Sequence, residues 1–416
     1  MNQAASAFLR LPALTGVAAP VRRNMLLLGA GMAALYGMVE LATAVATLTF
    51  VAAGGSHELA GLAPAIFLGS AASAALPAGR AMDRFGRAPT IRAGFAAGIC
   101  GSLTAALGAF SSSLPAVVLG FVLVGVSTGT VMLSRAAAAD MYPPDRRPQA
   151  ISLVLFGAVF GALLGPAVFT PLVQSSGAHG SSLGPAWLGA AGFMVVGLAV
   201  VTAIRRDPQQ IAQDISEEPE EDASPSEPLA HIVGRAGIRT VLLAAVASWA
   251  VMVTLMTLVG SALVHHGHSK SSIFPVLSAH FVGMFGLFLA VGWVIDRIGR
   301  ARALVGGLAL LGVSALALIG AVQSVALTAI ALFGVGLGWS CAYVAATSEL
   351  AEKASAVERG KLLGLSDLLS GLAGAGLTVL AGYILDTQGV EPVGIGAALV
   401  ALLSSFFILA KIARPA

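Results

Sequence analysis

The chain has 416 residues, of which 57% are hydrophobic and only 10% are charged, and its formal net charge is +3. A soluble protein carries about 25% charged residues, so this composition excludes a chain that keeps an aqueous surface around a single core. The small positive charge gives no reason to expect a nucleic-acid partner.

The sequence divides into apolar runs of roughly 20 residues, each long enough to cross a hydrocarbon layer of ~30 Å as a helix. Its 50 glycines suit closely packed membrane helices. We therefore predict an all-α membrane protein with twelve transmembrane helices. The predicted spans lie near residues 25–52, 59–79, 90–110, 114–138, 149–172, 184–204, 238–264, 271–294, 302–322, 325–347, 361–384 and 391–410.

Lysine and arginine lie almost entirely on alternate connections between these spans and near both ends of the chain, with Lys270 as the exception on the opposite side. Because positive residues stay cytoplasmic, we predict a multi-pass protein of the cell (inner) membrane with both termini in the cytoplasm. The residues that set the asymmetry in the connections include Arg80, Arg84, Arg87, Arg146, Arg147, Arg205, Arg206, Arg235, Arg239, Arg297, Arg300, Arg302, Lys353, Arg359 and Lys361.

One charged pattern, G-x-x-x-D-R-x-G-R, occurs twice, at Gly79–Arg87 and at Gly292–Arg300, 213 residues apart. Each copy lies between two apolar runs. A charged hairpin at the same place in each half indicates a duplicated membrane protein whose halves move against each other, as in a secondary transporter.

The repeat predicts two six-helix bundles, at residues 1–204 and 238–416, joined by a cytoplasmic linker at residues 205–237. The middle of the linker, Asp214–Pro228, is acidic and rich in proline and serine. Such a composition cannot bury a core, so we expect a disordered tether, with a regulatory docking role as the alternative.

Over essentially its whole length the chain resembles the major facilitator superfamily. The signature hairpin of that family is matched by Gly79, Asp83, Arg84, Gly86 and Arg87, and the second copy is unusually complete. The resemblance implies a transporter of a small molecule. We further expect a monomer that works with protons, is not an enzyme and has no cofactor.

These hairpins are the expected gate. Asp83 can meet the positive N-terminal end of a helix from the other half, and the resemblance suggests the helix that begins near Lys361. In the second half, Asp296 would face the start of the fifth span. We expect pairs between Arg87 and Asp140 and between Arg300 and Glu349; the alternative is that these charges only enforce topology. The expected gate residues are Gly79, Asp83, Arg84, Gly86, Arg87, Asp140, Arg146, Gly292, Asp296, Arg297, Gly299, Arg300, Glu349 and Arg359.

A polar stripe on the first span, with Tyr36, Glu40 and Thr43 at helical spacing, suggests the lining of a cavity. An acid near the centre of a span costs about 2.5–3.5 kcal/mol, so Glu40 should face a cavity or a partner. It could bind a proton in one conformation and release it in the other; the alternative is a neutral acid hydrogen-bonded within the bundle.

Similar stripes on three further spans complete the expected substrate site, where aromatic rings and one carboxyl suit an amphipathic or cationic ligand. Any single hydroxyl could instead serve packing. The expected substrate-binding residues are Tyr36, Glu40, Thr43, Thr130, Thr254, Thr257, Trp339 and Tyr343.

Two further buried groups, His280 and Asp367, are expected to join Glu40 in handling protons. A satisfied core histidine and a local hydrogen bond are the respective alternatives. His265, His266 and His268 cluster near the end of the seventh span, but Lys270 repels a cation and no carboxylate or cysteine completes the set. No metal site is therefore predicted.

The fifth span carries Gly157, Gly161, Gly165 and Pro166, which resemble part of a motif of the drug–proton antiporters, and we expect these glycines to pack closely against a helix of the other half. The chain departs from that group at Phe121, Phe169 and Thr170. The leading hypothesis is a proton-coupled exporter of small apolar or amphipathic organic compounds.

The rival hypothesis is a proton-coupled importer of a small organic nutrient or metal chelate. A membrane-embedded hydrolase is disfavoured, because the sequence has no H-E-x-x-H pair, no G-x-S-x-G elbow and no paired intramembrane aspartates.

Overall fold

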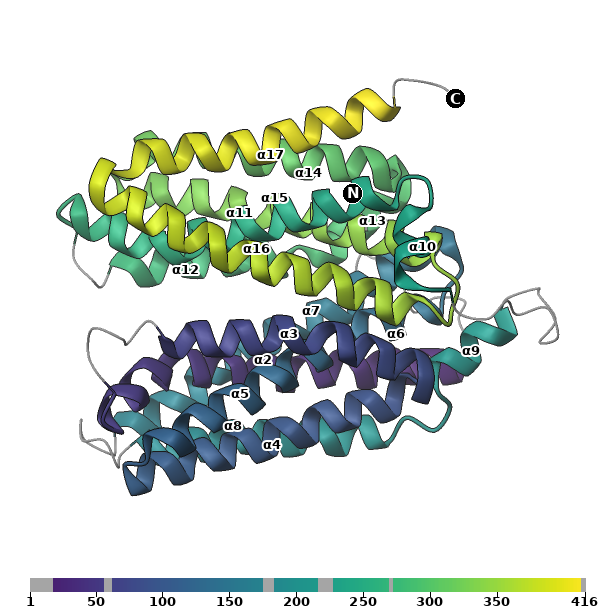
Figure 1. The fold of residues 1–416 in the computed structure, drawn as a ribbon, viewed down its shortest axis with the longest axis horizontal. Coiled ribbons are helices and arrows are strands. Elements are labelled where there is room, and N and C mark those ends of the chain that lie inside the picture. The colour runs from purple at the N-terminus through teal and green to yellow at the C-terminus, as the bar shows by residue number, and fades with distance from the viewer. Residues whose placement is uncertain (1–17, 56–61, 175–182, 216–226, 269–271, 413–416) are drawn as a thin grey trace, which may run out of the picture.

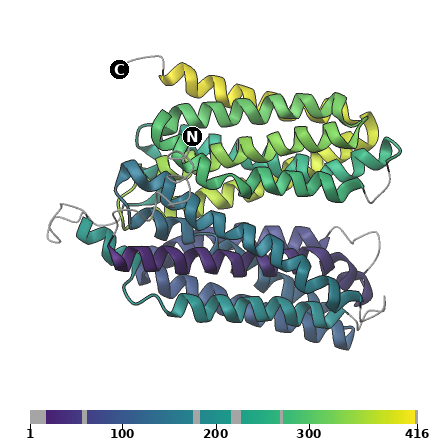
Figure 2. The ribbon, with the colours of Figure 1, turned by 180° about the vertical axis from the view of Figure 1, so that it is seen from behind.

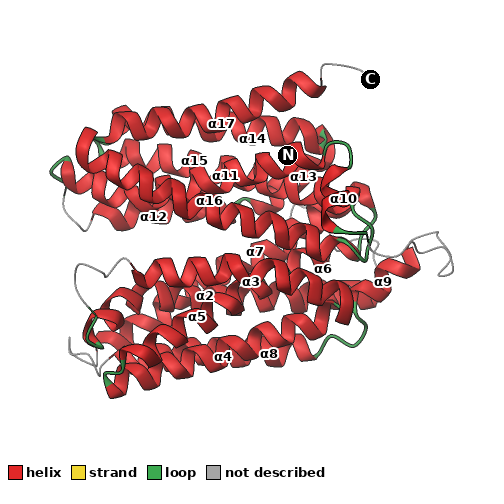
Figure 3. Ribbon diagram, in the orientation of Figure 1, coloured by secondary structure: helices red, strands yellow, loops and turns green. Residues whose placement is uncertain are grey.

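The computed structural model describes residues 18–55, 62–174, 183–215, 227–268 and 272–412, and within these ranges it contains helices and no strand (Figure 3). The first half comprises α2 (Ala19–Ala52), α3 (Leu62–Phe85), α4 (Arg87–Ser111), α5 (Leu114–Val131), α6 (Ser134–Asp140), the short turn η3 (Pro144–Arg146), α7 (Arg147–Gln174) and α8 (Gly184–Thr202). The second half comprises α11 (Ile238–His265), α12 (Ile273–Phe281), η7 (Val282–Gly286), α13 (Phe288–Ile298), α14 (Arg300–Ala321), α15 (Val325–Lys353), α16 (Arg359–Gln388) and α17 (Val390–Ile412).

The described helices account for the predicted spans. Eleven segments are long and apolar enough to cross a membrane, and the pair Pro275–Gly286 and Phe288–Ile298, bent by 47°, makes a twelfth when counted as one broken span. The bend falls at the π-helical turn η7, a feature that often marks a functional position in a helix. The all-α membrane fold is confirmed.

The outer surface of the bundle is apolar. Leu163 and Leu243 are 68% and 69% exposed, and many other large apolar side chains also face outward. A surface of this kind requires hydrocarbon rather than water around it.

The helices form two bundles, α2–α8 below and α11–α17 above in Figure 1, and Figure 2 shows the same division from behind. The bundles meet where α3 packs on α16 and where α7 packs on α13. We call the end at which α2 begins and α17 ends the terminal face; it lies to the right in Figure 1.

The linker is partly helical. α9 (Pro208–Ile215) and α10 (Leu229–Gly234) both lie at the terminal face (Figure 1). The expectation of a tether without structure therefore does not hold at these two ends of the linker, and its acidic middle, residues 216–226, lies outside the described residues.

Gly157 and Gly161 of α7 pack within their own half. A Cβ added to Gly157 would lie 2.0 Å from the carbonyl oxygen of Gly29, and one added to Gly161 would lie 2.2 Å from that of Ala33. Both partners belong to α2. The expectation that these two glycines face the other half is therefore wrong, because α7 turns them toward α2 and meets the other half through its first turns.

This packing makes Gly157→Ala a test of the fold. A methyl group at this position must displace the backbone of α2, and overpacking of this kind costs about 1–3 kcal/mol. We expect a lower melting temperature of the detergent-solubilised protein. Gly192→Ala, where nothing lies within 4 Å of the added atom, is the matched control and should leave the melting temperature unchanged or slightly higher; equal effects of the two variants would contradict the packing.

Candidate functional site: the interface between the halves

Asp83, at the terminal-face end of α3, binds the start of α16 in the other half. Its Oδ1 accepts a hydrogen bond of 2.9 Å from the Gly360 amide, and its Oδ2 accepts one of 2.7 Å from the Lys361 amide. The first amides of a helix have no partner within the helix and carry partial positive charge. The structure thus places Asp83 at the helix end expected from the sequence, and we call this contact the Asp83 clasp.

Two glycines make the clasp possible. A Cβ at Gly360 would lie 2.4 Å from the Gly79 carbonyl oxygen and 2.6 Å from Asp83 Oδ1, and one at Gly79 would lie 2.0 Å from the Gly360 carbonyl oxygen. Any side chain at either position would separate α3 from α16. Gly86, with φ of 100°, then turns the chain directly into α4, a conformation that favours glycine.

Arg87 and Asp140 extend the clasp into a buried ionic network. Arg87 Nη1 lies 2.6 Å from Asp83 Oδ1, and its Nε lies 2.6 Å from Asp140 Oδ2. The other oxygen of Asp140 lies 2.6 Å from Arg359 Nη1, across the interface. Arg87 also donates to the carbonyl of Ala356. The expected pair between Arg87 and Asp140 is present, and Arg359 joins it.

The second copy of the hairpin is arranged differently. Both carboxylate oxygens of Asp296 are buried without a hydrogen-bond partner among the described residues. Arg300 lies 3.9 Å from Glu349 but makes a closer pair with Glu352, and it donates to the carbonyl of Pro144 in the first half. The predicted Arg300–Glu349 pair is therefore present only as a long contact.

The remaining predicted gate residues lie around these contacts. Gly299 has φ of 87° and Gly292 packs on the first turns of α7. Arg84 and Arg297 are exposed and lie over the rings of their neighbours Phe85 and Trp293. Arg146 lies over the Tyr142 ring within the first half.

Asp207 in the linker holds the α3–α4 hairpin. Its two oxygens accept hydrogen bonds from the amides of Arg87, at 3.2 Å, and Ala88, at 2.8 Å, and so cap α4. Oδ1 also accepts from the Gln209 amide at the start of its own helix. Sequence reasoning missed Asp207. The Asp-Pro pair at the start of α9 indicates that Asp207 caps α9, but it gives no sign that Asp207 also caps α4.

The other end of the linker contacts the start of α16. Glu358 accepts hydrogen bonds from Arg235, at 2.8 and 3.0 Å, and from the Glu227 amide, at 3.1 Å. Burial of the Glu358 carboxyl raises its pKa, but these hydrogen bonds outweigh burial and the pKa lies below its ordinary value. Glu358 thus keeps its charge, and this contact with the linker, until the pH falls through that lowered pKa.

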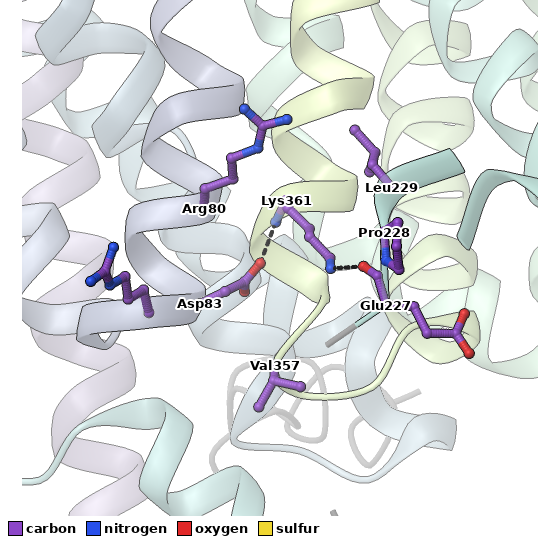
Figure 4. Close-up of a pocket in the computed structure, with 8 residues that line it drawn as sticks. Arg80, Asp83, Glu227, Pro228, Leu229, Val357 and Lys361 are labelled. Atoms are coloured by element: carbon purple, nitrogen blue, oxygen red, sulfur yellow. Dashed lines mark hydrogen bonds between the residues drawn. The ribbon is translucent and has the colours of Figure 1, made fainter. Parts of the chain in front are cut away.

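A cavity of about 410 Å³ opens beside the Asp83 clasp, between α3, the start of α16 and the linker (Figure 4). Figure 4 shows the Lys361 amide donating to Asp83 while the Lys361 ammonium donates to the Glu227 carbonyl. The residues that line it are Arg80, Asp83, Arg84, Glu227, Pro228, Leu229, Val357 and Lys361.

Deeper between the halves, Arg135 of α6 forms an ion pair with Asp367 of α16 at 2.6 Å. Arg135 also lies over the Tyr343 ring, 5.1 Å from its centroid. Arg135 is buried, with 1% of its surface exposed, so its guanidinium pairs with Asp367 and does not extend to water.

An aromatic cluster lies beside this ion pair. Trp339 stacks on Tyr343 with centroids 4.9 Å apart, and Trp249 and Phe285 approach Trp339 to 5.7 and 6.3 Å. Tyr36 of the first half meets Phe285 edge-on at 4.9 Å. The indole N–H of Trp339 is buried with no partner within the described residues. We call Tyr36, Trp249, Phe285, Trp339 and Tyr343 the aromatic cluster.

Glu40 lies one turn along α2 from Tyr36. Glu40, Arg135 and Asp367 are all within electrostatic range of the Tyr36 hydroxyl. The Glu40 side chain is half-buried, and no described residue donates a hydrogen bond to it. The structure thus brings together Tyr36, Glu40, Tyr343 and Asp367 from the predicted set.

Several predicted lining residues serve other contacts. Thr130 is buried against Gly94 of α4, inside the first half, a contact that fits the packing alternative. Thr254 is buried and bonds Thr378 of its own half at 3.0 Å. Thr43 and Thr257 are exposed, and their hydroxyls donate to carbonyls one turn earlier in the same helix.

The described contacts of the histidines do not include Glu40. His280 is fully buried, and its Nδ1 lies 2.9 Å from the Leu332 carbonyl oxygen of α15. His266 and His268 bond the carbonyls of Ala262 and Val322. Within the described part of the chain, no group of three or more His, Cys, Asp or Glu side chains is placed to hold a metal ion.

Known proteins share this sequence pattern. The family model described as Major Facilitator Superfamily matches residues 24–376 and 241–416. The uncharacterized MFS-type transporter YdeG of Bacillus subtilis (strain 168) is 29% identical over 357 residues, which cover 84% of this chain and 83% of YdeG. The riboflavin transporter RfnT of Brucella anthropi is 28% identical over 321 residues, which cover 76% of this chain and 78% of RfnT.

Solved structures share the fold. The human organic anion transporter MFSD10 (TETRAN) superposes with a TM-score of 0.74 at 19% identity, covering 94% of this chain and 100% of that one. FucP in the outward conformation gives a TM-score of 0.69 at 16% identity, covering 92% and 98%. With the family model matched over most of its length, this chain belongs to the Major Facilitator Superfamily.

Proposed function

We propose that this transporter works by alternating access and exports small apolar or amphipathic organic compounds in exchange for protons. The observation that carries the proposal is the Asp83 clasp, which ties α3 to α16 across the interface. The hydrogen bonds and ion pairs described between the halves all lie between the terminal face and the level of Arg135 and Asp367. They hold that face closed.

Opening the terminal face would break these contacts together. Asp83 and Asp140 would leave the amides and Arg359, and water would replace these donors. Hydrogen bonds to charged groups contribute about 1.5–3 kcal/mol each, so a few of them can hold one conformation without preventing the other.

We place the terminal face in the cytoplasm because it carries the arginines of both hairpins and both ends of the linker, and positive residues stay cytoplasmic. In the proposed topology, a protein of the cell membrane with these contacts formed is closed toward the cytoplasm.

Glu40 is the proposed coupling acid. It lies half-buried in α2 without a described donor, while Asp367 is held by Arg135. Neutral Glu40 suits the dry, closed arrangement and the ionised form suits an aqueous one, because burial without a partner disfavours charge. The Arg135–Asp367 pair would respond to the substrate, since Arg135 also faces the Tyr343 ring.

The aromatic cluster is the proposed substrate site. Stacked rings favour apolar and aromatic ligands, and the unpartnered Trp339 N–H could donate one hydrogen bond. Import of a planar aromatic nutrient is the second candidate, and the similarity to a protein named a riboflavin transporter supports it.

A deletion strain grown on a panel of toxins and nutrients, with and without an uncoupler, tests this function. Export predicts that the deletion strain is hypersensitive to aromatic or amphipathic toxins. With the uncoupler present, the deletion strain and its parent should be equally sensitive. A growth defect on one nutrient would support import instead. If neither deletion nor overexpression changed growth on any toxin or nutrient, both functions would be contradicted.

Asp83→Asn tests the clasp. The amide cannot replace a carboxylate that accepts from two amides and Arg87, so we expect the closed-to-open ratio at the terminal face to fall on the order of tenfold. Spin labels at Thr202→Cys and Ala301→Cys, two exposed positions at the terminal face of opposite halves, report the distance. Asp386→Asn, at an exposed carboxyl, is the control, and a distance distribution identical to that of the control would count against the clasp.

Glu40→Gln tests the coupling. In proteoliposomes we expect loss of pH-gradient-driven transport with substrate exchange retained, because the amide mimics the neutral acid permanently. Unaltered gradient-driven transport by this variant would exclude Glu40 as the coupling acid.

A further inference from the structure

The two hairpins place equivalent carboxylates in unequal surroundings. Asp83 receives the amides of Gly360 and Lys361. Asp296, 213 residues later in the second copy, has both oxygens buried, and no described residue donates to them with full hydrogen-bond geometry. Buried carboxylates without donors are rare, because a buried charge that lacks hydrogen bonds is destabilised.

The sequence explains this difference. The same spacing of 213 residues relates Gly360 and Lys361 to Arg147 and Pro148, at the start of α7. Proline has no N–H to donate, and Arg147 carries a side chain where Gly360 has none. Pro148 does lie at this contact, since its carbonyl oxygen would be 3.0 Å from a Cβ on Gly292. The second half therefore keeps the acid of a clasp but faces a helix end that lacks one of the two amide donors that Asp83 uses.

The charged neighbours do not replace the missing donors. Arg300 is engaged by Glu349, Glu352 and the Pro144 carbonyl. Asp145 and Arg146 act on Asp296 only through space and with opposite signs. Among the described residues, the Gln149 side chain is the one neighbouring amide that reaches the Asp296 carboxyl, but it forms no bond of full hydrogen-bond geometry, and its own Oε1 is buried without a partner. A protonated carboxyl is a donor as well as an acceptor, so it can also supply the proton that the buried Gln149 Oε1 lacks.

We propose that Asp296 is a proton-binding site linked to the terminal face, occupied when that face is closed and emptied when it opens. On opening, the O–H bond of the carboxyl breaks, the proton passes to water at the terminal face, and the carboxylate becomes hydrated. The sign follows directly: acid favours the closed terminal face, and alkali favours the open one. The two hairpins then differ in role, with Asp83 bound to the helix-end amides and Arg87 and Asp296 titrating.

The test uses the spin-labelled pair at residues 202 and 301, with Cys100 and Cys341 replaced by serine, in lipid nanodiscs across a range of pH. The parent should show more open terminal face as the pH rises. Asp296→Asn should remove most of that dependence and stay closed. Pro148→Ala restores an amide at the helix end, so it should favour the closed face at alkaline pH, where the carboxylate gains a donor.

Two further variants separate this inference from the proposed motion on which it rests. Glu40→Gln should keep the response that depends on Asp296, and Asp83→Asn should open the face at every pH. If Asp83→Asn opens the face while Asp296→Asn and Pro148→Ala both retain the parent's pH dependence, the role of Asp296 is overturned and the clasp stands. A terminal face that stays closed in every variant and at every pH overturns both.

Discussion

The arrangement depends on one carboxylate that meets the open end of a helix from the other half. The first amides of α16 need acceptors, and Asp83 supplies two oxygens at 2.9 and 2.7 Å. The approach requires a bare backbone on both sides, which Gly79 and Gly360 provide. A contact built from a few directional hydrogen bonds is strong at the native distance and vanishes when the helices separate, which is what a reversible closure requires.

The surrounding charges offset the cost of burying the Asp83 carboxylate. Arg87 lies between Asp83 and Asp140, and Asp140 lies between Arg87 and Arg359, so no charge in the chain of contacts lacks an opposite neighbour. Removing one member would leave its partner buried and uncompensated, which costs more than the pair contributes. The linker adds to both sides, with Asp207 on the α4 amides and Arg235 on Glu358. Behind the network lie the Arg135–Asp367 pair and the aromatic cluster, where a ligand could alter the balance between the halves.

The sequence predicts the features that repeat or that follow from polarity. Long apolar runs predict the spans, the doubled hairpin predicts that Asp83 meets a helix end of the other half, and the family resemblance points to the start of α16. It cannot predict how a helix turns about its axis: Thr130 shares a stripe with residues expected at a cavity, yet it faces Gly94. Nor does it predict partners far apart in the chain, such as Arg135 and Asp367, or the preference of Arg300 for Glu352 over Glu349. Pro148 is visible in the sequence, but its effect depends on the carboxylate that the fold places opposite it.

Hydrogen exchange at the start of α16 tests the central claim most directly. With the clasp formed, the amides of Gly360 and Lys361 donate to Asp83 and should exchange slowly, whereas in Asp83→Asn a peptide spanning these residues should exchange much faster while peptides from α14 remain unchanged. Equally slow exchange in the parent and the variant would show that the carboxylate does not hold the helix end, and the account of the interface would be wrong.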